Sequence, residues 1–233
     1  MQQEGLKHLS NHISYLPASD DPLSADVFFI RTDTSVYVYD VGSCAAAREQ
    51  IERIKEDKIV VLSHFHADHT ENLGKITFRS LYAGKETLKH VGEGNAVEGE
   101  MVLEPAIPIR LMTLPSSHAK GCVVLCYGNE YAFCGDAVYA TQKRFPVKSA
   151  GAHAEPKAMP EKETEGSQEP EYTIQTVYNA QKLKAMIEAF KALDVTYLVL
   201  SHEKNPVHLK GEVIRTLELI YRKRDKDSAY IVL

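Results

Sequence analysis

Four metal-binding side chains within six residues constrain this chain more than any other feature of its sequence. They lie in the stretch HFHADH at residues 64–69, which directly follows the apolar run 59–62. Such a run is typical of a buried strand, so the stretch lies where a strand ends and a loop begins. In open α/β sheets, ligands bind beyond the carboxyl ends of the strands. Imidazole nitrogens and carboxylate oxygens suit a divalent cation such as zinc. The stretch therefore predicts a metal site on an α/β scaffold.

Three further strand-like apolar segments also end in a residue that can bind a metal. They are 109–114, followed by His118; 131–134, followed by Asp136; and 195–200, followed by His202. If the carboxyl ends of these strands meet at one edge of the fold, their polar residues come together there. The sequence thus supplies partners for the residues of the first stretch.

The ordered set HxHxDH, a lone His, Gly-Asp and a final His resembles the metallo-β-lactamase superfamily over roughly residues 10 to 210. The resemblance implies an α/β fold, a four-layer αββα sandwich, in one domain spanning residues 1–233. It also implies two divalent metal ions, with zinc the first choice and iron or manganese the alternatives. The implied ligands are His64, His66 and His118 for the first ion and Asp68, His69 and His202 for the second, with Asp136 bridging both.

The resemblance also assigns roles beyond direct metal binding. Asp40, at the end of the apolar run 35–39, matches the early Asp of the family and would orient a ligand from behind. The alternative is an ordinary turn residue after a strand. Asp68 would handle the proton during turnover. Glu71 lies near the first turn of a helix expected to begin near Thr70, where the helix dipole favours a carboxylate, or else it points toward the metals.

Two ions roughly 3.5–4 Å apart can share a water and lower its pKa toward about 7, which makes hydroxide available at neutral pH. With two aspartates and a hydroxide, the site keeps about one positive charge, whereas the chain has a formal net charge of −5. We therefore expect a small-molecule substrate that is anionic or has a polarised carbonyl or phosphoryl group. The candidate substrate-binding residues are Lys120, Tyr139 and His208, for which a surface position is the alternative.

Asp136 directs the functional prediction within the superfamily. The best-known β-lactamases have a Cys ligand here, and Cys134 lies two residues away, but the Gly-Asp pattern favours Asp136. A bridging Asp resembles glyoxalase II and the lactonases. The first prediction is therefore a hydrolase that directs a metal-bridged hydroxide at a small ester, thioester or lactone. Glyoxalase II usually carries a further helical domain, for which this chain leaves little room after His202.

Two alternatives remain open. A phosphodiesterase or nuclease suits the metals, but an acidic chain without a basic stripe is poorly suited to hold a nucleic acid. A sulfur dioxygenase would instead hold one iron at His64, His66 and His118. The metal content discriminates these classes, since one iron per chain favours the dioxygenase.

Composition agrees with one domain of this kind. The chain has 233 residues, 44% of them hydrophobic, which suffices for a single core. It has no apolar window long enough to span a membrane and no signal-peptide pattern at its start. Its four cysteines show no CxxC pairing, and we expect buried free thiols and a cytoplasmic location. The oligomeric state is not indicated.

The expected elements alternate between sheet and helix. Strands are expected at 27–30, 36–39, 59–62, 81–83, within 102–114 and at 230–233, and helices at 45–55, 84–91, 176–193 and 211–221. The segment 155–171 has three prolines, six glutamates and no apolar periodicity. It predicts a flexible insertion, either a solvated loop or a lid over the site.

Overall fold

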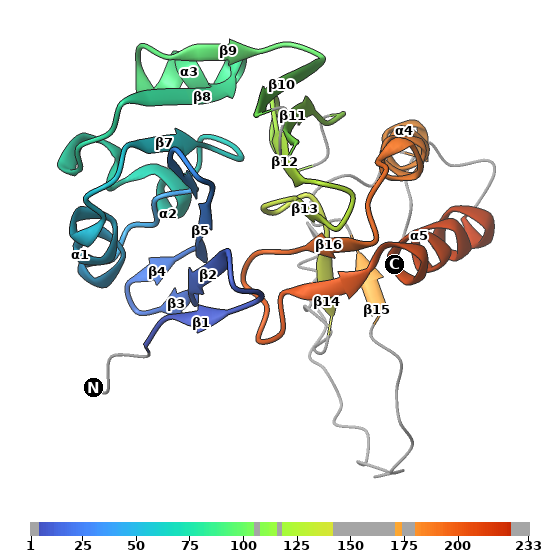
Figure 1. Cartoon of the computed structure of the whole chain (residues 1–233). Coiled ribbons are helices and arrows are strands. Elements are labelled where there is room, and N and C mark those ends of the chain that lie inside the picture. Colours follow the sequence, from blue (N-terminus) through green and yellow to red (C-terminus); the bar gives the residue numbers. More distant parts are fainter. Residues whose placement is uncertain (1–4, 105–107, 116–117, 142–170, 174–179, 225–233) are drawn as a thin grey trace, which may run out of the picture.

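The computed structural model describes residues 5–104, 108–115, 118–141, 171–173 and 180–224. Two β-sheets pack face to face, and helices cover the outer face of each (Figure 1). This is the four-layer αββα sandwich of the α/β class that the sequence predicts.

The first sheet has seven strands in the order β1-β2-β5-β6-β7-β8-β9. Their bounds are β1 (Lys7–His8), β2 (Ile13–Leu16), β5 (Val27–Arg31), β6 (Val36–Tyr39), β7 (Lys58–Val61), β8 (Ser80–Gly84) and β9 (Asn95–Val97). The strands from β6 to β9 run parallel, which requires crossover connections. The helices α1 (Ala45–Arg53) and α3 (Lys85–Val91) supply two of them.

The second sheet has six strands in the order β10-β11-β12-β13-β16-β17. Their bounds are β10 (Glu100–Glu104), β11 (Ile109–Thr113), β12 (Val123–Tyr127), β13 (Tyr131–Phe133), β16 (Tyr197–Val199) and β17 (Val207–Leu209). Only β13 and β16 pair in parallel, so these two strands end side by side. The helices α4 (Ala180–Ala192) and α5 (Lys210–Lys223) lie on the outer side of this sheet (Figure 1).

Short elements complete the described chain. Two small antiparallel pairs form from β3 (Ser19–Asp20) with β4 (Leu23–Ser24), and from β14 (Tyr139–Thr141) with β15 (Glu171–Thr173). A short helix, α2 (Ala67–Thr70), follows β7, and a 3-10 turn, η1 (Leu73–Lys75), follows it. No helix in the described ranges is long and apolar enough to cross a membrane.

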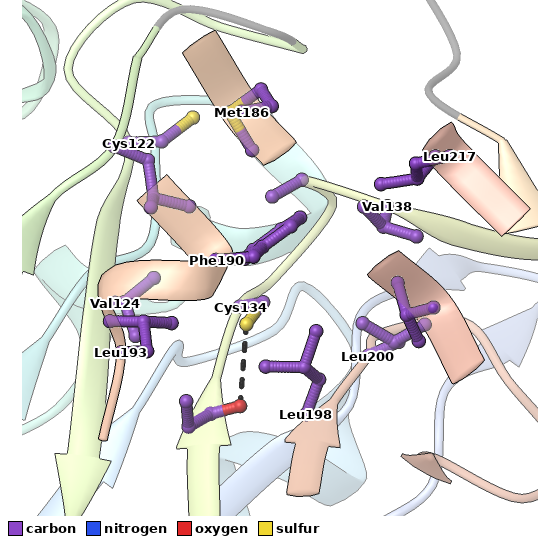
Figure 2. Close-up of a cluster of buried hydrophobic side chains, with 14 of the residues drawn as sticks. Cys122, Val124, Cys134, Val138, Met186, Phe190, Leu193, Leu198, Leu200 and Leu217 are labelled. Atoms are coloured by element: carbon purple, nitrogen blue, oxygen red, sulfur yellow. Dashed lines mark hydrogen bonds between the residues drawn. The ribbon is translucent and has the colours of Figure 1, made fainter. Parts of the chain in front are cut away.

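Alternating strand residues build the apolar core between the sheets. Phe28 of the first sheet and Phe133 of the second have ring centroids 5.0 Å apart, so aromatic contact joins the two layers. A separate apolar cluster lies between the second sheet and its helices, and it includes Phe190 of α4, Leu217 of α5 and Leu198 of β16 (Figure 2). Burial on both faces explains why these strands are nearly continuous apolar runs.

The helices expected at 45–55, 84–91 and 211–221 are confirmed within a few residues. The helix expected to begin near Thr70 is wrong, because α2 begins at Ala67 and ends at Thr70. The chain turns directly after extended His66, and the Thr70 hydroxyl donates to the His66 carbonyl at 3.0 Å. Asp68 and His69 are therefore helical rather than part of a loop.

The chain beyond these elements leaves some predictions untested. Of the predicted insertion 155–171, only the backbone of Glu171 lies within the described residues, in β15. The strand predicted at 230–233 lies outside them, as does the start of the helix predicted at 176–193. The flexible insertion and the single-domain organisation thus stay predictions.

Candidate metal centre

The predicted ligands lie just beyond strand ends and form two clusters. They are His64, His66, Asp68 and His69 after β7, His118 between β11 and β12, Asp136 after β13 and His202 after β16. The first cluster has three histidines and the second has two histidines and two aspartates: His64, His66 and His118; Asp68, His69, Asp136 and His202. Within each cluster, one ligand atom from each residue lies within 4.8 Å of the others. Both clusters combine residues from the two sheets.

The first cluster contains two histidines, His64 and His118, whose environment favours the neutral ring. His118 Nε2 lies 2.8 Å from His66 Nδ1. Burial lowers the pKa of His64 to about 2 and also lowers the pKa of His118. The Ser63 hydroxyl lies 2.8 Å from His64 Nδ1, which directs Nε2 of that ring into the cluster. A neutral imidazole with a fixed orientation is what a metal requires.

The second cluster brings carboxylates against histidines. Asp68 Oδ2 lies 3.1 Å from His202 Nε2, and Asp136 Oδ1 lies 3.2 Å from His69 Nε2. Burial would raise the pKa of both carboxyls, but the neighbouring histidines outweigh it and hold both values below the usual one. Both side chains are therefore carboxylates at neutral pH, as metal ligands need to be.

Asp136 faces both clusters. Its Oδ1 lies 3.2 Å from His69 Nε2 and 3.7 Å from His202 Nε2, while its Oδ2 lies 3.6 Å from His118 Nε2. The preceding Gly135 has a φ of 53°, and a Cβ there would lie 2.6 Å from the Cβ of Ser63. The Gly-Asp pair of the sequence is thus required for the backbone to bring this carboxylate between the clusters.

Asp40 lies behind the second cluster. Its Oδ2 lies 2.8 Å from His69 Nδ1, and its Oδ1 accepts the Ser63 backbone N–H at 2.7 Å. Burial alone would lower the pKa of His69, but the Asp40 and Asp136 carboxylates raise it well above its usual value. Metal binding at His69 would therefore release a proton. This geometry agrees with the orienting role expected for Asp40.

The structure brings one candidate substrate residue into contact with a cluster. Tyr139 is buried, and its Oη lies 3.3 Å from His118 Nδ1. Lys120 is exposed on the same loop as His118. His208 lies on β17 in neither cluster, with its Nδ1 3.0 Å from Tyr172 Oη.

Glu71 does not join the clusters. Its side chain is 54% exposed, and its carboxylate lies 3.0 Å from Lys75 Nζ. Glu71 does not point toward the metals, and it is not in the first turn of a helix as expected, because it is the C-cap of α2.

Two residues at the centre were missed by the sequence analysis. Ser63 contacts the rings of His64 and His69 through its hydroxyl. Asp26 is buried and accepts the backbone N–H of His202 at 2.7 Å. A signal for Asp26 existed, since a polar residue directly precedes the apolar strand 27–31 and a buried polar group needs a hydrogen-bond partner.

The donor atoms fit divalent ions. Although His69 Nε2 and Asp136 Oδ1 are close, neither forms a hydrogen bond within the described residues, nor does His64 Nε2, and all three atoms are buried. A buried polar atom without a partner costs free energy, which a cation would offset. Cys134 is not a competing ligand, because its thiol donates to the Ala132 carbonyl at 3.3 Å inside the apolar cluster (Figure 2).

The other cysteines also agree with the prediction of free thiols. Cys122, Cys126 and Cys134 are free and buried, and Cys44 is free and partly buried. Burial raises the pKa of Cys122 and Cys126 to about 11. Cys122 and Cys126 are therefore inert packing residues.

Comparison with known proteins bears on the fold and the family. The model of the metallo-β-lactamase superfamily matches residues 20–202. VMB-1 has 16% sequence identity and a TM-score of 0.63, over 94% of this chain and 99% of its own. The DIM-1 metallo-β-lactamase has 13% identity and a TM-score of 0.61, and the match covers 92% of this chain and 97% of that protein. A metallo-β-lactamase from Erythrobacter litoralis has 15% identity and a TM-score of 0.57, and the match covers 92% of this chain and 94% of that protein.

The comparisons also limit what can be said of the subgroup. No curated protein matches the sequence. The similar structures named above support the fold but not the predicted glyoxalase II or lactonase subgroup, and the superfamily rests on the family model. At these identities the likeness concerns the fold alone.

Proposed function

The chain belongs to the metallo-β-lactamase superfamily, whose model matches residues 20–202, and on that premise we propose that it is a binuclear metal-dependent hydrolase of small esters, thioesters or lactones. The single observation that carries this proposal is the position of Asp136. One of its oxygens faces His69 and the other faces His118, so one carboxylate can serve both clusters. This is the arrangement that a bridging ligand requires.

The residues divide between two ions, for which zinc is the first choice and iron or manganese the alternatives. His64, His66 and His118 would hold one ion, and Asp68, His69 and His202 would hold the other, with Asp136 as a ligand shared by both. Such ions supply Lewis-acid chemistry that brings the pKa of a shared water toward about 7. Ser63 and Asp40 keep the rings of His64 and His69 turned toward the cluster.

Asp68 is the residue we assign to proton transfer. Its carboxylate is partly exposed, and its Oδ2 is oriented by His202 Nε2 at 3.1 Å. Because its pKa is held below the usual value, this carboxylate is unprotonated at neutral pH. It can therefore take the proton of the attacking water and deliver it to the leaving group.

Substrate selection is assigned to the residues beside the first cluster. Tyr139 Oη contacts His118, and Lys120 lies exposed on the loop that follows His118. A lysine there suits an anionic small molecule, in agreement with the positive charge expected of a loaded site. His208, in neither cluster, is the weakest of the three candidates.

One alternative keeps a specific observation in its favour. The three-histidine cluster is complete in itself, so a single iron at His64, His66 and His118 would suit a dioxygenase. A phosphodiesterase uses the same two-ion arrangement, but the chain has a net charge of −5.

Metal content and a substrate panel test the proposal together. The purified protein is analysed for zinc, iron and manganese per chain, and then assayed on thioester, lactone, phosphodiester and β-lactam compounds. Two divalent ions per chain with thioester or lactone hydrolysis are expected. One iron per chain with oxygen consumption, or turnover confined to phosphodiesters, would replace the proposal by the corresponding alternative.

A further inference from the structure

A buried carboxylate of the first sheet holds a loop of the second. Asp26 is 1% exposed and directly precedes β5, whereas His202 follows β16. Asp26 Oδ2 accepts the backbone N–H of His202 at 2.7 Å and the Ser201 hydroxyl at 3.4 Å. Both hydrogen bonds cross from one sheet to the other, so a buried side chain next to β5 fixes the backbone that follows β16.

The neighbouring residue holds the other side of the second cluster. The backbone N–H of Ala25 donates to the carbonyl of Asp68 at 3.0 Å. The side chains of Asp68 and His202 in turn meet at 3.1 Å. Two consecutive residues, Ala25 and Asp26, thus fix the backbone of two proposed ligands of the second ion, Asp68 and His202, from outside the cluster.

The backbone of His202 needs such support. Its φ is 60°, in the left-handed region that a residue with a Cβ adopts at a cost. A strained conformation of this kind persists only where its surroundings determine it. The neighbouring amide of Ser201 donates to the Gly135 carbonyl at 3.2 Å, while the His202 amide has its acceptor in Asp26.

The contacts of Asp26 are confined to this side of the centre. Within the described part of the chain, its carboxylate accepts from Ala18, Ser201 and His202 and from no residue of the three-histidine cluster. Removing it should therefore affect one metal position and not the other.

We propose that Asp26 is a positioning residue that holds His202 in the conformation needed to bind the second ion, and that its loss loosens the second ion while leaving the first in place. This inference rests on the proposed two-ion centre. It assigns Asp26 no contact with substrate.

Metal release from the zinc-loaded protein tests the proposal. The wild type, Asp26→Ala and Asp26→Asn are mixed with a chromophoric chelator, and the ions released in each kinetic phase are counted. Asp26→Ala should release one ion per chain about 10–100 times faster than the wild type, the range typical of partners behind a ligand, and the other at an unchanged rate. Asp26→Asn keeps one oxygen to accept the His202 N–H. Its release rate for that ion should therefore lie between those of the wild type and Asp26→Ala.

A matched control removes an exposed carboxylate. Asp20 lies on β3 and is exposed, and Asp20→Ala should release both ions at wild-type rates. If Asp26→Ala does not fold, the comparison of Asp26→Asn with Asp20→Asn decides the question. Equal acceleration of both ions, or acceleration of neither, would overturn the inference.

Hydrogen–deuterium exchange on the same proteins separates this inference from the proposed function. The segment that contains the His202 amide should exchange faster in Asp26→Asn, whereas the segment containing Ser63 and His64 should not change. If the wild type holds only one ion, the two-ion proposal fails on that count. If exchange at His202 is also unaltered, the hold of Asp26 on the loop is refuted independently.

Discussion

Asp40 Oδ2 lies 2.8 Å from His69 Nδ1, and both side chains are buried. The carboxylate fixes the orientation and tautomer of the ring, so that Nε2 faces the second cluster. Asp40 itself has a φ of 57°, so the backbone turns sharply to deliver the carboxylate. The early Asp of the sequence is thus tied to the HxHxDH motif by a direct contact.

Asp40→Asn tests this contact. Asn adopts the left-handed region comparatively well, so the backbone should be kept while the carboxylate is lost. We expect metal affinity at the second position to fall about 10–100-fold. Competitive zinc titration measures it, with Asp33→Asn at an exposed position as the control. Unchanged affinity would show that the Asp40 charge does not support His69.

Asp136→Ala tests the bridge. The variant removes a carboxylate whose two oxygens face both clusters, so we expect fewer than two ions per chain. Turnover should fall more than about 100-fold, because even partners behind a ligand cost 10–100-fold. Metal analysis, steady-state kinetics and circular dichroism check the outcome, with Asp33→Ala as the control. Two bound ions and full turnover in a folded variant would make the bridging assignment wrong.

Gly84→Ala tests the support of the His118 loop. A Cβ at Gly84 would lie 2.0 Å from the carbonyl oxygen of Gly121, so β8 and the loop cannot both keep their positions. We expect a loss of about 1–3 kcal/mol in the free energy of unfolding, typical of overpacking. Urea denaturation measures it. Gly74→Ala is the matched control, since nothing lies within 4 Å of that Cβ. Equal stability of the two variants would contradict the close contact.

His208 provides a test by pH. Burial lowers its pKa from the usual 6.5, so below pH 6.5 the unfolded chain binds more protons at this residue than the folded protein. The contribution of His208 to stability is therefore present above pH 6.5 and lost as the pH falls below it. His208→Gln should make the free energy of unfolding depend less on pH in that range.

Urea denaturation from pH 5 to 8, with zinc in excess, follows this dependence for both proteins. The same slope in the wild type and in His208→Gln would mean that His208 titrates alike in the folded and unfolded states. A kinetic comparison at pH 8 uses the same variant, because a raised KM there would restore a substrate role for His208.

The position of the candidate centre was predictable because its residues are polar side chains at the ends of apolar runs. His118, Asp136 and His202 each follow such a run, and the fold brings these strand ends together. That β13 and β16 are neighbours in parallel could not be derived, because apolar periodicity shows which segments are strands and not which strands pair.

The residues that support the centre were harder to predict. Ser63 and Asp26 act through contacts with parts of the fold distant in sequence, such as the 176-residue separation between Asp26 and His202. The start of α2 was missed for a local reason, since an HxHxDH pattern does not show where extended backbone changes to helix. Tyr139 and His208 looked alike in sequence, and only the tertiary fold separates one beside His118 from one on β17.

Each sheet comes from a continuous half of the chain, the first from residues 7–97 and the second from residues 100–209. Each cluster takes ligands from both halves, so each bound ion would cross-link the first half of the chain to the second. Neither cluster is complete in one half, so we expect full metal binding only after both halves have formed and docked. A chain cut between β9 and β10 should therefore yield fragments whose association strengthens with zinc and weakens with a chelator.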